Sequence, residues 1–266
     1  MGFSAAYPTI EHRRAAELIV GACSQHPDTE AVILVGSCAR GKARWDSCLD
    51  VMILVLPEVL AAKRGDLEHW WESLYQSEPA FQALRRLAKF SHVDLEFVDG
   101  RFAPGPHGWT TGPDEFELAI GNTLVYSAPL WQRGDYLQQL KAEWLPYYGE
   151  DLRLERLAMV RRFCLNNLEH IPPYVERGLY FQAFNRLYHA FGEFLQALFI
   201  ARRTYPIAYD KWIREQIEEI LGLPELYRQL PGLLEIQHFE SEEIADKARE
   251  LVRLVAEYVP AQVRSA

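Results

Sequence analysis

Cysteine is scarce in this sequence and shows no paired spacing. The 266 residues contain four cysteines, at positions 23, 38, 48 and 164, and no C-x-x-C motif. This excludes a small disulfide-stapled scaffold and favours a reducing compartment. Also missing are a basic-then-apolar N-terminal signal and any stretch of about 18 uncharged apolar residues, the length of a membrane span. We therefore expect a soluble, cytoplasmic protein without a membrane partner.

An excess of basic charge is missing as well. Lys and Arg total 28 against 37 Asp and Glu, so the formal net charge is −9. Affinity for polyphosphate chains depends on clustered Lys and Arg, which counts against a nucleic-acid partner but leaves room for a local basic pocket. What is present is 49% hydrophobic residues, enough for a globular core in one or two domains.

The first half of the chain alternates between helical and strand patterns. Apolar residues at helical spacing predict helices over 9–26 and 58–88. Short apolar runs predict strands at 31–35 and 50–56, and period-two alternation predicts a third at 90–98. A Gly- and Pro-rich loop at 99–113 follows, and residues 116–127 are expected to form a hairpin or a last strand that turns at Gly121-Asn122.

Beyond about residue 135 the pattern becomes helical. Amphipathic stretches separated by Pro or Gly breaks cover 135–145, 151–170, 178–203, 209–222 and 241–259. This pattern predicts a helical bundle. We therefore expect an α+β protein with two domains, residues 1–134 containing the strands and residues 135–266 containing the bundle.

The segment VGSCARGKARWDSCLD, residues 35–50, has the glycine and lysine spacing of a P-loop but fails the other requirements of that motif. Ala43 stands where a hydroxyl would bind Mg²⁺. Only eight residues separate Gly41 from Asp50, which opens the next strand. A crossover to a parallel strand takes about a dozen residues or more, so this geometry excludes the P-loop.

The same segment suits another way of binding phosphates. Gly36 allows a sharp turn after the first strand, and Ser37 with the N–H groups that follow can meet a triphosphate. Arg40 adds a forked cation. Asp50 and Asp94, each on a strand, would then hold Mg²⁺ beside the bound phosphates.

These residues resemble the signature of the polymerase-β-like nucleotidyltransferase superfamily, a glycine-serine pair followed by S-D-x-D and a third acid on a later strand. Here the elements are Gly36-Ser37, then Ser47-Cys48-Leu49-Asp50, and Asp94. The chain is most similar to the bacterial small-molecule group, which includes antibiotic adenylyltransferases. The resemblance implies a small mixed β-sheet domain followed by an α-helical domain.

One residue departs from the family pattern. Cys48 stands where the resemblance implies the first metal-binding aspartate, and a thiol is a soft ligand whereas Mg²⁺ prefers oxygen. Three interpretations are open. The chain is a weakened enzyme or a pseudoenzyme that still binds nucleotide, Asp46 or Glu96 replaces the missing ligand, or the thiol supports a softer metal such as Zn²⁺ or Mn²⁺.

The helical half offers two further candidates. Arg186, His189 and Glu193 lie on one side of an almost wholly apolar helix. They form either a satisfied polar contact with another helix or one wall of a cleft, where Glu193 would accept a proton from an acceptor hydroxyl. Lys211 is either a solvated helix-start lysine or a cation that neutralises nucleotide phosphates.

The resemblance implies an activity. The chain would transfer a nucleoside monophosphate, AMP from ATP or the equivalent part of another nucleoside triphosphate, to a hydroxyl of a small-molecule acceptor. Its cofactor would be Mg²⁺ or Mn²⁺, held by Asp50 and Asp94. The alternative is a catalytically inactive nucleotide-binding or regulatory, partner-binding module on the same fold, and Cys48 is the feature that favours it.

Overall fold

The computed structural model describes residues 5–261 and divides the chain into two compact units. The sheet unit contains the chain up to Ala103 together with Ala119–Leu145, and the helical unit contains Pro104–Leu118 and the chain from Pro146 onward. The sequence predicted a single boundary after residue 134. The structure instead assigns residues 135–145 to the sheet unit and the segment 104–118 to the helical unit, because side chains of that segment are bonded to helices that follow it in the sequence.

In the described residues of the sheet unit, the strands form one mixed sheet in the order β3-β2-β1-β4. The strands are β1 (Ala31–Leu34), β2 (Leu49–Leu54), β3 (Val93–Val98) and β4 (Ala128–Gln132). β1 pairs antiparallel with both β2 and β4, whereas β2 and β3 are parallel. The antiparallel pairing of β1 and β2 confirms that the short connection between them cannot be a P-loop crossover.

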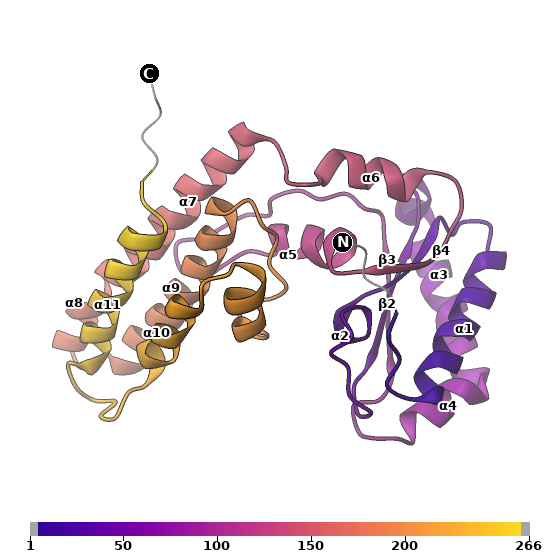
Figure 1. Cartoon of the computed structure of the whole chain (residues 1–266), viewed down its shortest axis with the longest axis horizontal. Coiled ribbons are helices and arrows are strands. Elements are labelled where there is room, and N and C mark those ends of the chain that lie inside the picture. Colours follow the sequence, from indigo (N-terminus) through magenta and orange to yellow (C-terminus); the bar gives the residue numbers. More distant parts are fainter. Residues whose placement is uncertain (1–4, 262–266) are drawn as a thin grey trace. The chain divides into compact units, whose positions relative to one another are not determined.

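Helices pack against one face of this sheet. They are α1 (Ile10–Gln25), α3 (Pro57–Ser77) and α4 (Pro79–Arg85) (Figure 1). α3 and α4 each begin at a proline, which suits the first helical position because its missing N–H has no partner there. Buried apolar side chains from these helices and from the alternate strand positions Leu49, Val51 and Ile53 form the core. Asp50 and Met52 therefore lie on the other face.

Residues 116–125 are helical, so the hairpin or strand predicted over 116–127 is wrong. α5 (Phe116–Ile120) continues into a π-helical turn at Gly121–Val125, and β4 begins only at Ala128. Phe116 and Ile120, four residues apart, are both buried, as on one face of a helix. Thr123 donates a hydrogen bond to the Met52 sulfur, which places this turn on the face of the sheet that carries Asp50. α6 (Tyr136–Trp144) follows β4 and ends the sheet unit.

The helical unit confirms the predicted bundle with some differences in its elements. Its α-helices are α7 (Glu150–Glu169), α8 (Ile171–Glu176), α9 (Tyr180–Ala201), α10 (Pro224–Leu234) and α11 (Glu243–Tyr258). α9 is the buried central helix that its apolar sequence predicts. α8 and α10 were not predicted, and the expected helix at 209–222 is reduced to a π-helical turn at Glu215–Ile220. The Gln216 side chain bonds backbone groups of Ile207, Ala208 and Lys211, which holds the preceding loop out of the helix.

Among the helices of residues 5–261, none combines the length and the apolar character that crossing a bilayer requires.

Candidate metal centre

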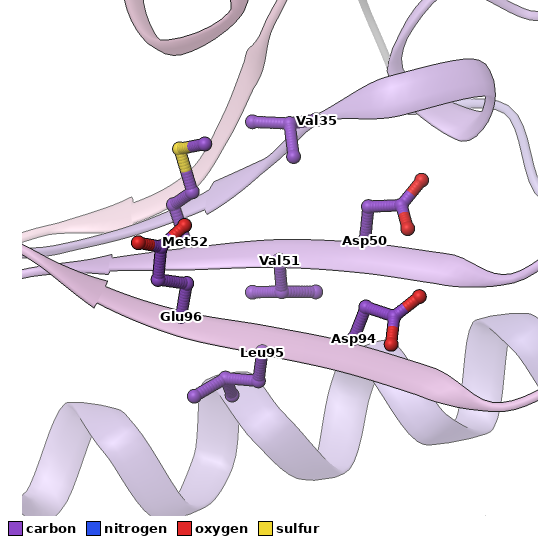
Figure 2. Close-up of a pocket in the computed structure, with 7 residues that line it drawn as sticks. All are labelled: Val35, Asp50, Val51, Met52, Asp94, Leu95 and Glu96. Carbon is purple, nitrogen blue, oxygen red and sulfur yellow. The ribbon is translucent and has the colours of Figure 1, made fainter. Parts of the chain in front are cut away.

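Asp50 and Asp94 are direct neighbours on adjacent strands. The parallel register of β2 and β3 pairs Asp50 with Asp94, and the next pair on the same face is Met52 with Glu96. Figure 2 shows the two aspartate side chains next to each other at one end of a pocket, with Met52 and Glu96 at its other end. The pocket has a volume of about 230 Å³ and lies entirely within the sheet unit. The two predicted acids are therefore brought together.

Gly36 is required by its contact with Asp50 as well as by the turn. Its φ of +65° is left-handed, and a Cβ at this position would lie 2.1 Å from Asp50 Oδ2. A side chain would therefore collide with the carboxylate, so only glycine lets Asp50 rest against the start of α2 (Gly36–Ala39). The backbone N–H of Val35 also donates to the carbonyl oxygen of Asp50 at 3.0 Å.

The two other predicted phosphate-binding residues lie in the same turn. Ser37 is half-buried in the first turn of α2, and its carbonyl oxygen accepts from the Lys42 N–H at 2.9 Å. Arg40 is almost fully buried, and its Nη1 donates to the carbonyl oxygen of Gly36 at 3.2 Å. The Arg40 guanidinium therefore holds the turn together and adds positive charge beneath it.

Cys48 completes a cluster with the two acids. The sulfur and one carboxylate oxygen from each of Asp50 and Asp94 all lie within 4.8 Å of one another. Burial, together with the negative charge of Asp50 and a hydrogen bond to it, raises the pKa of the Cys48 thiol to about 12. Without a bound cation the thiol is therefore protonated at neutral pH and donates to Asp50.

This donor set fits one hard divalent cation better than two. Two neighbouring carboxylates provide the oxygen ligands that Mg²⁺ and Mn²⁺ prefer, and a neutral thiol does not. The acids considered as replacements lie outside the cluster within the described residues. Asp46 is partly exposed and forms a 3.8 Å ion pair with Arg44, and Glu96 lies two residues beyond Asp94 on β3. The structure therefore gives no support to either replacement.

His92 contacts the site, although the sequence indicated only an exposed or hydrogen-bonded side chain. Its Nε2 lies 3.1 Å from Asp94 Oδ1, and the imidazole is partly exposed. The sequence feature that could have indicated this contact is the spacing of two residues between His92 and Asp94, which puts both on one face of an extended chain. An imidazole hydrogen-bonded to a carboxylate orients that carboxylate for a ligand.

His12 is a second residue that sequence reasoning missed. It is fully buried in α1, and its Nε2 donates to the carbonyl oxygen of Ser47 at 2.9 Å while its Nδ1 accepts from the Thr9 hydroxyl at the same distance. The Cys38 thiol donates to the next carbonyl, that of Cys48, at 3.7 Å. These bonds fix the loop just before Asp50. No local pattern marks His12, because its partner is 35 residues away.

Glu193 is placed in the interior of the helical unit. It is fully buried, accepts from Asn167 Nδ2 at 2.8 Å, and lies 3.6 Å from His107 Nε2. Arg186 Nη1 donates to the same Asn167 at 2.6 Å. Glu193 thus lies among buried polar contacts between α7 and α9, and its role as a base for an acceptor hydroxyl stays a prediction. Lys211 is exposed in the helical unit, and its role with phosphates stays a prediction.

Glu193 adjoins a buried polar network that pins the segment 104–118 to the helices. Arg156 of α7 donates its Nε to Glu117 Oε1 at 2.6 Å and its Nη2 to Asp114 Oδ1 at 2.7 Å. Gln196 of α9 donates to both acids, at 3.1 Å to Asp114 and 2.8 Å to Glu117. His107 Nδ1 lies 3.1 Å from Asp114 Oδ2. In this network each buried carboxylate meets a cation or an amide, as burial of charge requires.

Comparisons with solved structures show a likeness in fold. No family model and no curated protein matches this chain. Its structure is similar to that of a nucleotidyltransferase-like protein from Exiguobacterium sibiricum 255-15, with 15% sequence identity and a TM-score of 0.43. The likeness covers 94% of this chain and 78% of the other. The case for a function therefore rests on the residues of this chain.

Proposed function

We propose that this chain binds a nucleoside triphosphate together with one divalent cation and transfers the nucleoside monophosphate, AMP from ATP, to a hydroxyl of a small molecule. The observation that carries the proposal is the direct pairing of Asp50 with Asp94 beside a glycine whose missing side chain makes room for one of the carboxylates. Carboxylates on neighbouring strands beside a phosphate-binding turn are what nucleotidyl transfer uses.

Each group has a role in this proposal. The N–H groups at Gly36 and Ser37 would bind the terminal phosphates, since the first N–H groups of a helical turn lack intrahelical partners. Arg40 would hold that turn through its bond to the Gly36 carbonyl and add positive charge. Asp50 and Asp94 would hold Mg²⁺ or Mn²⁺, which neutralises charge on the phosphates. Lys211 is proposed as a further phosphate-neutralising cation.

The Cys48 thiol limits the rate in this proposal. A site with two carboxylates and a neutral thiol has one negative charge fewer than the three acids of the family pattern. By comparison with the removal of other electrostatic stabilisers, the cost is about 3 kcal/mol in the transition state, or about a hundredfold in rate. The protein would therefore be a slow enzyme.

Cys48 also favours a second candidate function, a catalytically silent nucleotide-binding or regulatory module. In that case Asp50 and Asp94 would hold a cation and nucleotide without turnover. The two candidates share the binding step and differ only in the transfer step.

The test is pyrophosphate release with ATP, Mg²⁺ or Mn²⁺ and a panel of small hydroxylated acceptors. We expect slow release that Asp50→Asn or Asp94→Asn reduces about a hundredfold. Glu96→Gln is the matched control, because Glu96 lies on the same strand and the same face as Asp94 but pairs with Met52. Absence of release under every condition, together with absence of ATP binding by calorimetry, would reject both candidates.

Cys48→Asp separates the two candidates. If the protein is a weakened enzyme, restoring the third carboxylate should raise Mg²⁺-dependent release about a hundredfold. If the variant still binds ATP but releases no pyrophosphate, the result would favour the catalytically silent module.

A further inference from the structure

A second pocket in the sheet unit lies next to the acid pair and has the opposite charge. It lies between the C-terminal ends of α3 and α4 and the start of β3, and its volume is about 510 Å³. Its lining includes Tyr75, Gln76, Arg85, Lys89, Ser91 and His92. Among the described residues that line it, none is Asp or Glu. The basic residues of this lining are Arg85, Lys89 and His92, although the whole chain has a net charge of −9.

His92 joins this cationic pocket to the candidate metal centre. The imidazole lines the cationic pocket, and its Nε2 is 3.1 Å from Asp94 Oδ1, which lines the other pocket. Both pockets belong to the same compact unit, so this proximity does not depend on the helical unit. His92 is therefore shared by the lining of the cationic pocket and the contacts of Asp94.

We propose that the cationic pocket binds the phosphate group of a phosphomonoester, and that this compound is the acceptor of the nucleotidyl group. Arg85 offers a fork of N–H donors and Lys89 a compact charge, a set that suits a tetrahedral dianion. The volume lies in the range of about 300–1,000 Å³ typical of small-molecule sites. The acceptor role rests on the proposed function, whereas binding of the phosphate does not.

The order of the strands explains why this phosphate belongs to the acceptor and not to the nucleotide. The Gly36-Ser37 turn follows β1, the cationic pocket lies at the start of β3, and β2 with Asp50 lies between them. Two strand spacings separate the two places by about 10 Å. In-line displacement puts the attacking and leaving oxygens on opposite sides of the phosphorus. Pyrophosphate would leave on the β1 side, and the acceptor would approach from the β3 side.

The acceptor hydroxyl oxygen forms a bond to the α-phosphorus, and the bond from that phosphorus to the bridging oxygen of pyrophosphate breaks. The bridging oxygen keeps the electron pair, and the hydroxyl proton passes to water. The acceptor's own phosphate stays intact and serves only as the anchor.

A purely structural account of Arg85 makes a different prediction. Arg85 is in the last turn of α4, where the helix dipole favours a cation, and its guanidinium lies 5.9 Å from the centre of the Tyr75 ring. If this were its only role, replacing it would lower the free energy of unfolding without changing the affinity for a phosphomonoester. Measuring both quantities distinguishes the two accounts.

The experiment is calorimetric titration of the full chain with glycerol 3-phosphate, with glycerol and inorganic phosphate as separate probes, in the absence of nucleotide and cation. We expect glycerol 3-phosphate and phosphate to bind and glycerol not to bind. The double variant Arg85→Gln/Lys89→Gln should bind glycerol 3-phosphate at least about tenfold more weakly. Arg86→Gln is the matched control, because Arg86 is the exposed neighbour that does not line the pocket, and it should bind like the wild type.

Several results would overturn the proposal. One is no binding of glycerol 3-phosphate by the wild type, and another is equal binding by the wild type and the double variant. In a separate titration with ATP, loss of affinity by the same factor in the double variant would mean that the pocket belongs to the nucleotide and that the acceptor role is wrong. Because the glycerol 3-phosphate titrations contain neither nucleotide nor cation, a failure of pyrophosphate release would not affect them, so the two proposals fail separately.

Discussion

Two polar clusters, one in each unit, differ in how their charges are balanced. In the sheet unit, Asp50 and Asp94 stand side by side next to a protonated thiol, and the described residues that line their pocket include a third carboxylate, Glu96, but neither Lys nor Arg. In the helical unit, Asp114 and Glu117 share Arg156, whose bonds to them are 2.6–2.9 Å long. The first cluster gathers negative charge, and the second neutralises it.

The difference follows from solvent. Asp50 and Asp94 are partly or largely exposed, so water solvates their charges and the pair can persist without a fixed protein cation. Glu117 is fully buried, and a buried carboxylate without a partner would cost several kcal/mol. Clusters of like charge that water can reach are typical of binding and catalytic sites, whereas matched buried charges are typical of structural networks.

The largest effect is expected from breaking the structural network. Arg156→Met would leave Glu117 without a cation and Asp114 with only His107, and it should lower the free energy of unfolding by about 3–5 kcal/mol. Urea denaturation followed by helical circular dichroism measures it. Arg253→Met is the control, because Arg253 forms an exposed pair with Glu257 on α11 and should cost about 1 kcal/mol or less. Equal losses in the two variants would contradict the assignment of the network.

A smaller effect is expected at the glycine that accommodates Asp50. Gly36→Ala places a Cβ against the Asp50 carboxylate in a left-handed conformation. Gly41→Ala has a similar φ of +70°, and among the described residues its Cβ meets only Ala6 Cβ, at 3.8 Å. The left-handed strain of about 1–2 kcal/mol is common to both variants. Gly36→Ala should therefore lower the free energy of unfolding more than Gly41→Ala does, and it alone should weaken Mn²⁺ binding. Thermal denaturation and Mn²⁺ titration check this, and identical results for both variants would show that the contact with Asp50 does not matter.

The stability of the polar network in the helical unit should depend on pH through His107 and Asp114. Burial alone would lower the pKa of His107, but hydrogen bonds and charges from Asp114 and Glu193 outweigh it and raise the pKa to about 9 from its ordinary 6.5. The stabilisation from protonated His107, which also stacks on Phe163 of α7, is thus complete below about pH 6.5 and lost as pH rises through 9. Asp114 acts in the opposite sense, because His107 and Arg156 overcome its burial and hold its pKa well below the ordinary 3.8, so its stabilisation is lost only in acid.

The measurement is hydrogen exchange of residues 104–118 between pH 6.5 and 9, corrected for intrinsic exchange rates. Protection should decrease over this window in the wild type. His107→Gln removes the titrating group, so its protection should be lower at pH 6.5 and change little with pH. A wild-type segment whose protection does not depend on pH in this range would rule out a protonated His107 in the network.

The smallest effect is expected from neutralising the acid pair. Asp50→Asn keeps the size of the side chain and removes one of two neighbouring negative charges, so the free energy of unfolding should change by less than about 0.5 kcal/mol or increase slightly. Urea denaturation without divalent cations checks it. A loss of several kcal/mol would mean that Asp50 has a structural role like that of Glu117, and the contrast between the two clusters would fail.

The acids of the candidate site could be predicted because local pattern determines their place. Asp50 opens one apolar run and Asp94 interrupts another, and alternation along a strand puts each on the polar face. The short distance from Gly41 to Asp50 also excluded a parallel crossover, which the antiparallel pairing confirms. The hypothesis that Asp46 or Glu96 replaces the missing acid came from proximity in sequence, which does not measure distance across a sheet.

The errors occur where partners are far apart in the chain. Residues 116–127 contain apolar pairs that suit a strand or a helix equally, and the helix is stabilised by contacts of Glu117 with Tyr148, Arg156 and Gln196. The loop at 99–113 gave no sign that its second half belongs with the helices, since its anchors, such as Gln196, are about 80 residues away.

By itself the sequence determined the helical and strand character of most segments, the turn at Gly36 and the polar face that carries Asp50, because periodicity and glycine conformation act over a few residues. Only the tertiary structure decided that Asp50 lies beside Asp94, that His92 and His12 support the site, and that Glu193 is buried. Those outcomes depend on strand register and on contacts between residues that are far apart in the sequence. The periodicity of a short segment does not reveal such contacts.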